Sequence, residues 1–94
     1  MKGGYTYVMR NVTRTALYVG VTDDIRRRNS EHQEGIGSAL TKKYRCKYLL
    51  YYEWFDKITE AIASEKQLKN WKREWKLNLI RETNPKLRDL RNNI

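Results

Sequence analysis

The sequence predicts an α+β fold in which a three-stranded antiparallel sheet is flanked by about three to four helices. Three observations indicate this class: two short strand-like stretches joined by a hairpin-length segment, a later apolar and aromatic run, and long stretches with helical spacing. Because a chain of 94 residues builds only a modest core, we expect one domain over residues 1–94, with a polar C-terminal tail from about residue 86.

The first two strands are predicted by the alternation of their side chains. Over residues 5–11 this alternation places Tyr5, Tyr7 and Met9 on one face of a strand. Residues 17–21 form the second strand, and the short polar segment before them has the length of a hairpin connection. The two strands should therefore pair in antiparallel fashion.

Two further features belong to the sheet. Tyr18 and Gly20 share one face of the second strand, because successive side chains point to opposite faces. Residues 48–55 are apolar or aromatic on both faces except at Glu53. This pattern predicts a third strand that is covered on both sides.

Helices are predicted between and after these strands. Residues 24–34 form the first helix, which Gly35 ends. A long helical region begins after Asp56 and ends at Asn84, directly before a proline. We expect it to divide near residues 70–73 into two helices and to be followed by a frayed turn or a short helix. The apolar side chains that recur at helical spacing in this region are Ile58, Ala61, Ile62, Leu68, Trp71, Trp75 and Leu79.

Composition limits the classes of function. The formal net charge of +9 attracts acidic polymers, of which nucleic acid is the usual one. Seven tyrosines and three tryptophans lie among the basic residues, but most of them, including Trp71 and Trp75, should fill the core. The single cysteine, Cys46, excludes an internal disulfide, should be buried, and suits a reducing compartment. Because no stretch has the length of a signal core or a membrane span, we expect a cytoplasmic protein.

Two polar side chains of the first helix indicate a site. Arg28 and His32 are four residues apart and therefore share one helix face. That face should be apolar, yet Ile25 is the only hydrophobic anchor of the segment. Polar groups that point inward cost free energy unless they are paired. Another side chain or a ligand should therefore lie opposite them.

A carboxylate also interrupts an apolar stripe in the second half of the chain. Glu65 lies four residues after Ala61 and three before Leu68, so the stripe passes through it. A carboxylate there must pair with a cation, take up a proton or bind a metal. For Glu65 alone an ordinary salt bridge is favoured. Together with Arg28, His32 and the strand tyrosines, it indicates a functional site.

This set of side chains contains the parts that phosphodiester hydrolysis needs. The reaction requires a base that activates water, a cation that stabilises developing charge, a group that assists the leaving oxygen and commonly a divalent metal. Mg²⁺ prefers oxygen ligands and keeps several waters, so one carboxylate and a substrate phosphate oxygen can suffice.

Taken in order, these residues resemble the GIY-YIG nuclease family, and in particular its small stand-alone bacterial members, over nearly the whole chain. The resemblance is carried by Tyr18-Val19-Gly20, by Arg28 and His32, by Thr41-Lys42-Lys43-Tyr44, and by Glu65 within Ala63-Ser64-Glu65-Lys66-Gln67. It implies a three-stranded antiparallel sheet flanked by helices and a metal-dependent endonuclease that hydrolyses DNA.

The resemblance also assigns roles to individual residues. Tyr7 and Tyr18 would be the motif tyrosines, one of them acting as or positioning the general base. Arg28 would bind the scissile phosphate, His32 would assist proton transfer, and Glu65 would hold Mg²⁺ or Mn²⁺. We expect these five side chains to converge around a space that fits a phosphate, with the sheet as its floor and Glu65 on the wall opposite Arg28.

The first half-motif departs from the family pattern, because Tyr5-Thr6-Tyr7 stands where Gly-Ile-Tyr is expected. Tyr7 fits better since it lies eleven residues before Tyr18, but Tyr5 faces the same side and alternation does not exclude it. Gly20 is the glycine of the second half-motif. Asn84 has a counterpart near the site in some relatives, yet Asn before Pro is also an ordinary helix end, which we favour.

Basic residues outside this cluster would bind the nucleic-acid backbone. Lys42, Lys43 and Arg45 are well placed, because a loop can follow a phosphate backbone. Arg27 lies on the solvated face of its helix and would add a phosphate contact.

The leading hypothesis is an endonuclease that acts on branched, nicked or otherwise structured DNA in repair or recombination, with RNA not excluded as a substrate. Because so short a chain has no room for a recognition domain, a protein partner or the shape of the DNA would supply specificity. The alternatives are a nucleic-acid-binding module with little or no turnover, and a protein-interaction domain in which Glu65 pairs with Arg28. We expect a monomer that does not associate with membranes.

Overall fold

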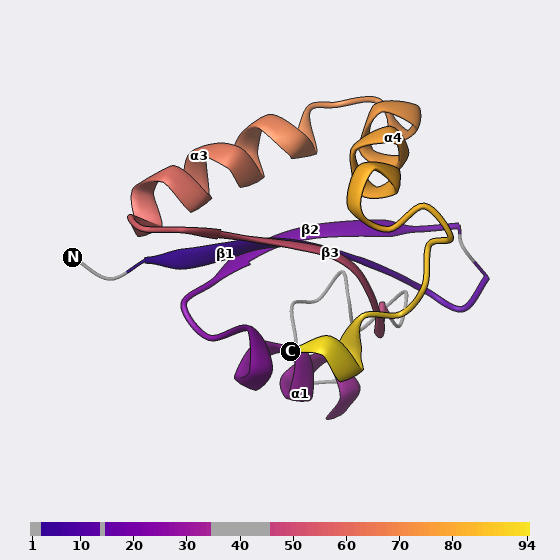
Figure 1. Ribbon diagram of the computed structural model, residues 1–94, viewed down its shortest axis with the longest axis horizontal. Coiled ribbons are helices and arrows are strands. Elements are labelled where there is room, and N and C mark those ends of the chain that lie inside the picture. The colour runs from indigo at the N-terminus through magenta and orange to yellow at the C-terminus, as the bar shows by residue number, and fades with distance from the viewer. Residues whose placement is uncertain (1–2, 14, 35–45) are drawn as a thin grey trace.

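A three-stranded antiparallel sheet forms the centre of the structure, as predicted. The computed structural model describes residues 3–13, 15–34 and 46–94. The strands are β1 (Gly4–Arg10), β2 (Leu17–Thr22) and β3 (Tyr48–Phe55). β1 pairs antiparallel with both of the others, so the order is β2-β1-β3 (Figure 1).

The hairpin between β1 and β2 is fixed by one side chain. The Asn11 amide oxygen accepts the backbone N–H groups of Thr15 and Ala16 at 2.9 and 3.1 Å. Asn favours such turns because its side chain can replace a backbone hydrogen-bond partner. The turn sets the register in which Tyr7 lies opposite Gly20.

Helices cover both faces of the sheet (Figure 1). On one face lies α1 (Ile25–Glu34), and on the other lie α3 (Ile58–Lys69) and α4 (Arg73–Thr83). The long helical region therefore divides where it was expected to. Together with the antiparallel sheet, these three α-helices of the described residues confirm the predicted α+β class.

The alternation of β1 decides which side chain meets which helical layer. Thr6 points to α3, where its hydroxyl donates to the Ala61 carbonyl at 2.8 Å. Tyr7 and Met9 point to the opposite face and pack in one cluster with Ile25 of α1. The sheet thus separates two small cores. The buried members are Val8, Val19, Leu50, Tyr51, Leu68 and Ile80 on the α3 side, and Tyr7, Met9, Ile25, Cys46 and Leu49 on the α1 side.

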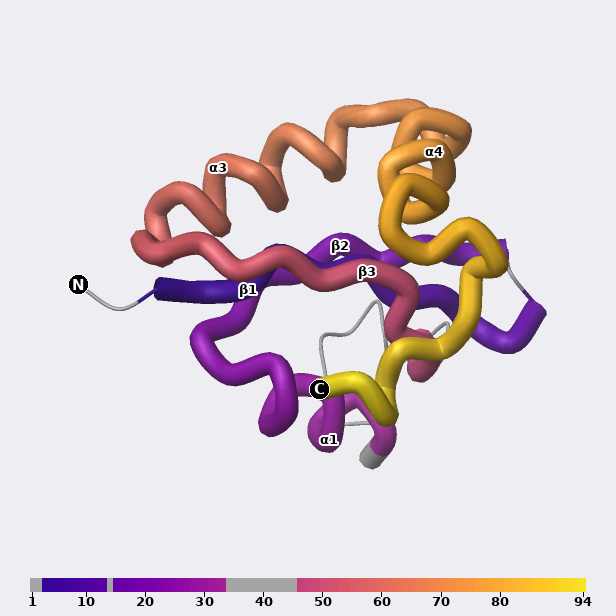
Figure 2. Tube along the Cα trace, in the orientation of Figure 1, coloured from indigo at the N-terminus to yellow at the C-terminus, as the bar shows by residue number. Residues whose placement is uncertain are grey.

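The segment after α4 is bound to β3 and is not frayed. The Leu90 N–H donates to the Leu49 carbonyl at 2.7 Å, and the Leu49 N–H donates to the Asp89 carboxylate at 3.2 Å. The chain then forms the 3-10 helix η1 (Arg91–Asn93) beside α1 (Figure 2). A short helix was one of the two predicted alternatives. Because the segment is mostly polar, the sequence did not indicate that Leu90 and Ile94 pack against the α1-side core.

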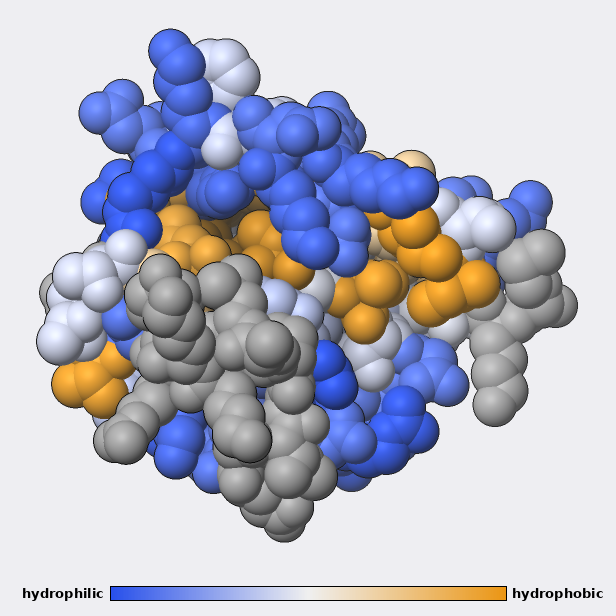
Figure 3. All heavy atoms as spheres, turned by 180° about the vertical axis from the view of Figure 1, so that it is seen from behind, coloured by the Kyte–Doolittle hydropathy of each residue, from blue (hydrophilic) through white to orange (hydrophobic). Residues whose placement is uncertain are grey.

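Two tryptophans are more exposed than the sequence predicted. Trp75 on α4 is 52% exposed, although helical spacing placed it in the core. β3 is covered on both faces only in its first half, and Trp54 in its second half is 50% exposed. Elsewhere α3 and α4 turn hydrophilic side chains outward, and hydrophobic residues gather at the level of the sheet (Figure 3).

Among the residues that the structure describes, none of the helices combines the length and the apolar character that crossing a membrane requires.

Candidate active site

Helix α1 is held at its first turn. The Thr22 hydroxyl accepts the Asp24 N–H at 3.1 Å, and the Asp24 carboxylate accepts the Arg27 N–H at 3.1 Å. The second contact is that of an N-cap residue, which satisfies a free N–H group of the helix. Burial of Ile25 completes the anchor. This anchor turns the face that carries Arg28 and His32 toward the sheet.

The Tyr7 hydroxyl is the centre of the cluster that these residues form. It lies 3.0 Å from His32 Nε2 and accepts a hydrogen bond from Arg28 Nε at 3.2 Å. Tyr7 is 1% exposed and His32 is 3% exposed. Two polar side chains of α1 thus share one strand hydroxyl as a hydrogen-bond partner, which explains why they point inward.

Burial and Arg28 together set the charge states of the cluster. Burial raises the pKa of Tyr7 to about 12, although the nearby Arg28 opposes the shift. Burial also lowers the pKa of His32 to about 4, and the positive charge of Arg28 adds to this effect. The hydrogen bond to Tyr7 raises the pKa of Arg28. At neutral pH the cluster therefore consists of a neutral phenol, a neutral imidazole and one guanidinium cation.

These charge states fix the direction of the hydrogen bond between Tyr7 and His32. A neutral imidazole has one nitrogen that accepts a hydrogen bond. Because the Tyr7 oxygen already accepts from Arg28, its own proton is available to His32 Nε2. His32 Nδ1 is buried and has no hydrogen-bond partner among the described residues. The pair can therefore act as a phenol and its proton acceptor.

Tyr18 and Gly20 complete the cluster on β2. The ring of Tyr18 lies 6.1 Å from that of Tyr7 and 5.6 Å from that of His32, measured between centroids. The Tyr18 phenol also contributes to the raised pKa of both Tyr7 and Arg28, in keeping with its place beside the Tyr7 ring. Gly20 lies under the Tyr7 ring, and a Cβ there would be 2.5 Å from the Tyr7 oxygen.

Arg28 connects this buried cluster to a cavity of about 480 Å³ at the end of β2. Its side chain is 25% exposed and donates to the Glu31 carboxylate at 3.1 Å. The cavity is lined by Gly3, Val21, Thr22, Asp23, Arg27, Arg28, Glu31 and Ile58. Its wall carries two guanidinium groups and two carboxylates, so an anion would compete with Glu31 for the Arg28 guanidinium that the Tyr7 hydroxyl orients.

Glu65 does not join the other four residues, and the expectation that all five converge is wrong. It lies on α3, on the opposite face of the sheet from Arg28 (Figure 1). The reason is the alternation of β1, since Thr6 faces α3 whereas Tyr7 faces α1. The sheet therefore separates Glu65 from the Tyr7 cluster and does not form a common floor.

The ion pairs differ from the pairing of Glu65 with Arg28 that the protein-interaction alternative requires. Glu65 pairs with Lys69 at 3.3 Å, one helical turn away, and Arg28 pairs with Glu31. Glu31 was missed by the sequence argument. Its spacing of three residues from Arg28 was the available signal, because such residues meet on a helix surface.

The remaining predicted residues lie at the margin of the cluster or away from it. Tyr5 packs beside the α1-side core, and Arg27 pairs with Asp23 at 2.7 Å on the surface of α1. Asn84 ends α4, and its amide bonds the Leu50 and Arg88 backbone, so it is the expected helix end. Lys42, Lys43 and Arg45 lie outside the described residues.

Glu65 is the carboxylate that the family resemblance assigns to a divalent metal, and its surroundings on α3 can be compared with that role. Within residues 3–13, 15–34 and 46–94, no three His, Cys, Asp or Glu side chains are grouped as a metal site. Mg²⁺ can bind through one carboxylate when substrate oxygens and waters complete its shell. The Glu65 side chain is 16% exposed and faces an exposed lysine that can move away. Glu65 thus fits a metal site that the substrate completes.

Comparison with known proteins gives the family of the chain. The GIY-YIG catalytic domain matches residues 3–78. A UPF0213 protein of Staphylococcus saprophyticus is 40% identical over 67 residues, which cover 71% of this chain and 82% of that protein. A UPF0213 protein of Staphylococcus aureus is 32% identical over 82 residues, covering 87% and 99% respectively.

A solved structure shares the fold. The solution NMR structure of a UPF0213 protein from Bacillus halodurans has a TM-score of 0.57 and 24% identity, and the match covers 93% of this chain and 92% of that one. The domain match includes the strands, α1 and α3, and with them the Tyr7 cluster and Glu65. The chain belongs to the GIY-YIG family, as one of its small bacterial members related to the UPF0213 proteins.

Proposed function

We propose that this chain is an endonuclease that hydrolyses DNA phosphodiester bonds with the help of a divalent metal ion. The observation that carries the proposal is the buried Tyr7 hydroxyl, which holds Arg28 and His32 together at the edge of a cavity. The GIY-YIG family in general consists of metal-dependent nucleases that act on DNA. The net charge of +9 favours the same substrate class.

Arg28 would bind the phosphate that is cleaved. Its Nε is held by Tyr7 and its Nη1 by Glu31, so the guanidinium is oriented before any substrate arrives. An oriented cation stabilises the charge that develops on the phosphate in the transition state. Binding of the anion would also offset the charge of Arg28, which helps to lower the pKa of His32. Substrate would therefore make His32 a better proton acceptor.

Tyr18 would meet the attacking water. Tyr7 is almost completely buried, whereas Tyr18 is partly exposed and lies beside Arg28. As the water oxygen bonds to phosphorus and the bond to the leaving oxygen breaks, the leaving oxygen would take up a proton from solvent water. The proton of the attacking water would pass to Tyr18. The Tyr18 proton would pass to Tyr7 and that of Tyr7 to His32, which, at the end of the relay, would release a proton to solvent after the reaction. Tyr7 thus positions the cluster and relays a proton.

Glu65 would hold the metal ion, Mg²⁺ or Mn²⁺, on the other face of the sheet. Because β2 is an outer strand, DNA that crosses its edge would meet Arg28 on one face and Glu65 on the other. A divalent cation at Glu65 would neutralise phosphate charge. The target would be recognised by the shape of branched or nicked DNA, or through a protein partner.

The test is cleavage of a panel of end-labelled nicked, gapped, flapped and branched DNAs in Mg²⁺ or Mn²⁺. We expect cuts by the wild type, and loss of cutting in Arg28→Gln and Glu65→Gln. Arg81→Gln is the matched control for charge, because Arg81 is exposed on α4, and Glu60→Gln is the control on α3. If the wild type binds DNA in a salt-dependent manner but cuts no faster than Arg28→Gln, the chain is a binding module and the proposal fails.

A further inference from the structure

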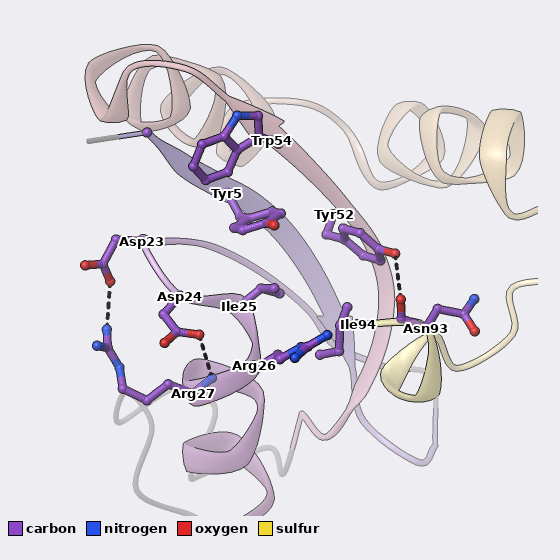
Figure 4. A pocket seen from close by; sticks show the side chains of 11 residues that line it. Tyr5, Asp23, Asp24, Ile25, Arg26, Arg27, Tyr52, Trp54, Asn93 and Ile94 are labelled. Carbon is purple, nitrogen blue, oxygen red and sulfur yellow. Dashed lines mark hydrogen bonds and ion pairs between the residues drawn. The ribbon is translucent and has the colours of Figure 1, made fainter. Parts of the chain in front are cut away.

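A second cavity, of about 740 Å³, lies on the α1 side of the sheet and is walled by aromatic side chains. Tyr5, Tyr52 and Trp54 stand in a row along the outer ends of β1 and β3 (Figure 4). The first turn of α1 lies opposite them and carries Asp24 and Arg26 (Figure 4). A volume of this size is within the range of small-ligand sites.

The three aromatic rings, here called the platform, pack edge to face, and Trp54 is the most exposed of them. The Tyr5 ring meets Trp54 edge to face at a centroid distance of 5.0 Å and Tyr52 at 6.2 Å. The indole Nε1–H of Trp54 donates to Asp56 at 3.2 Å, which fixes the orientation of that ring. Trp54 nevertheless remains 50% exposed. A fixed and half-exposed indole is suited to stacking, because the side chain has already lost its conformational entropy when the protein folds.

The charges of the cavity indicate which part of a nucleotide would bind there. Its wall carries two carboxylates, Asp23 and Asp24, and two guanidinium groups, Arg26 and Arg27. The Arg28 cavity has the same balance, but there the buried Tyr7 hydroxyl orients the Arg28 guanidinium, so this wall favours a phosphate less than Arg28 does. It offers hydrogen-bond acceptors and donors around an aromatic floor, which is what the polar edge and flat face of a nucleobase need.

The position of the cavity connects it to the candidate active site. It shares Gly3, Asp23 and Arg27 with the cavity that Arg28 lines, so the two adjoin. Tyr5 and Tyr7 point to the same face of β1 two residues apart, which corresponds to about 7 Å along a strand. A nucleic-acid strand with a phosphate at Arg28 can therefore place a neighbouring base on Tyr5 and Trp54.

We infer that the Tyr5, Tyr52 and Trp54 platform stacks an unpaired nucleobase next to the bond that is cut. The inference rests on the proposed function and deepens it. A base inside a duplex is already stacked on both sides, whereas a flap, gap or overhang supplies a base with a free face. The substrate class is therefore DNA with unpaired nucleotides beside the cleaved bond.

The test is equilibrium binding in EDTA, where metal-dependent cleavage is blocked. The ligand is a fluorescein-labelled duplex with a single-stranded overhang, and an abasic residue replaces each overhang base in turn. We expect one abasic position to weaken binding of the wild type by about 5- to 150-fold, the range of a single base-aromatic stack. Trp54→Ala should bind the intact overhang as weakly as the wild type binds the abasic overhang. The variant should therefore no longer distinguish the intact overhang from the abasic one.

Trp75→Ala is the matched control, because Trp75 is equally exposed but lies on α4, across the sheet. It should keep the full discrimination, and Trp54→Phe should restore most of it. An unfolding midpoint of Trp54→Ala close to that of the wild type shows that the variant is folded. If the folded Trp54→Ala variant discriminates like the wild type, or if the wild type does not distinguish the abasic overhang, the inference is overturned.

The two proposals fail in different ways. Cleavage of the DNA panel without base discrimination refutes the stacking platform and leaves the nuclease intact. Discrimination in EDTA without any cleavage in metal refutes the nuclease and supports the platform. Absence of DNA binding refutes the platform outright.

Discussion

Replacing Gly20 by alanine tests how closely the hydroxyl cluster is packed. A Cβ at position 20 would lie 2.5 Å from both Cζ and the oxygen of Tyr7 and 2.8 Å from a ring carbon of Tyr18. Ordinary contacts of this kind begin near 3.4 Å, so the Tyr7 ring must move by roughly 1 Å. Such a shift would lengthen the hydrogen bonds of 3.0 Å to His32 and 3.2 Å to Arg28 until both are lost.

The expected magnitude follows from these contacts. Forcing a methyl group into a packed site costs about 1–3 kcal/mol, and each lost hydrogen bond adds about 1 kcal/mol. With both hydrogen bonds lost, Gly20→Ala should therefore lower the free energy of unfolding by about 3–5 kcal/mol and the melting temperature by roughly 15–25 °C. Misplacing a catalytic group by about 1 Å costs on the order of 10²-fold in rate. The cleavage rate should fall accordingly at a temperature where the variant is folded.

Two assays are used. Thermal unfolding is monitored by circular dichroism, and the cleavage rate is measured on the best substrate in the DNA panel. Gly4→Ala is the matched control, because a Cβ there meets the end of the Ile58 side chain on the α3 face. That variant should lose stability but keep the hydrogen bonds of the Tyr7 hydroxyl, and any loss of activity should be smaller than in Gly20→Ala. A Gly20→Ala protein as stable and as active as the wild type would refute the reasoning, since alanine in place of glycine is otherwise mildly stabilising.

Further predictions concern His32, Asn84 and the C-terminal segment. The pKa of His32 is about 4 in the folded chain and about 6.5 when unfolded. Between pH 6.5 and 4 His32 is therefore protonated in the unfolded chain but not in the folded chain. As the pH is lowered through this range, the free energy of unfolding should decrease by up to about 3 kcal/mol. Urea titrations should show this loss in the wild type and a smaller one in His32→Gln; equal pH dependence would contradict the assignment. Asn84→Ala removes three hydrogen bonds to the Leu50 and Arg88 backbone and should cost about 1–3 kcal/mol in chemical unfolding. An unchanged urea midpoint would show that Asn84 does not hold the end of α4. Leu90→Ala removes a side chain packed on the α1-side core and should lower the melting temperature, whereas an unchanged melt would mean that the segment is not bound to β3 in solution.

Much of the fold follows from periodicity in the sequence. The alternation of Tyr5, Tyr7 and Met9 predicted their common face, and the apolar run at 48–55 predicted β3 with its observed bounds. The inward direction of Arg28 and His32 followed from a helix with Ile25 as its hydrophobic anchor. These features are local, so a periodic pattern is sufficient to predict them.

The position of Glu65 could not be predicted in the same way. Periodicity shows that Glu65 faces the sheet but does not show which face of the sheet α3 covers. That choice depends on the path of the chain after β3, which is a tertiary property. The exposure of Trp54 has a similar origin, because it depends on how far the helices extend over the far end of β3.

The central claim is that the Tyr7 hydroxyl organises a catalytic site, and single-turnover cleavage by Tyr7→Phe tests it most directly. The substitution removes the shared partner of Arg28 and His32 and leaves the ring in place. Tyr51→Phe is the control, because Tyr51 is also buried but bonds Glu53 on the α3 side of the sheet. We predict that Tyr7→Phe cuts about 10²- to 10⁴-fold more slowly while DNA affinity is unchanged. Tyr51→Phe should cut at the wild-type rate. Cleavage by Tyr7→Phe at the wild-type rate would contradict the claim.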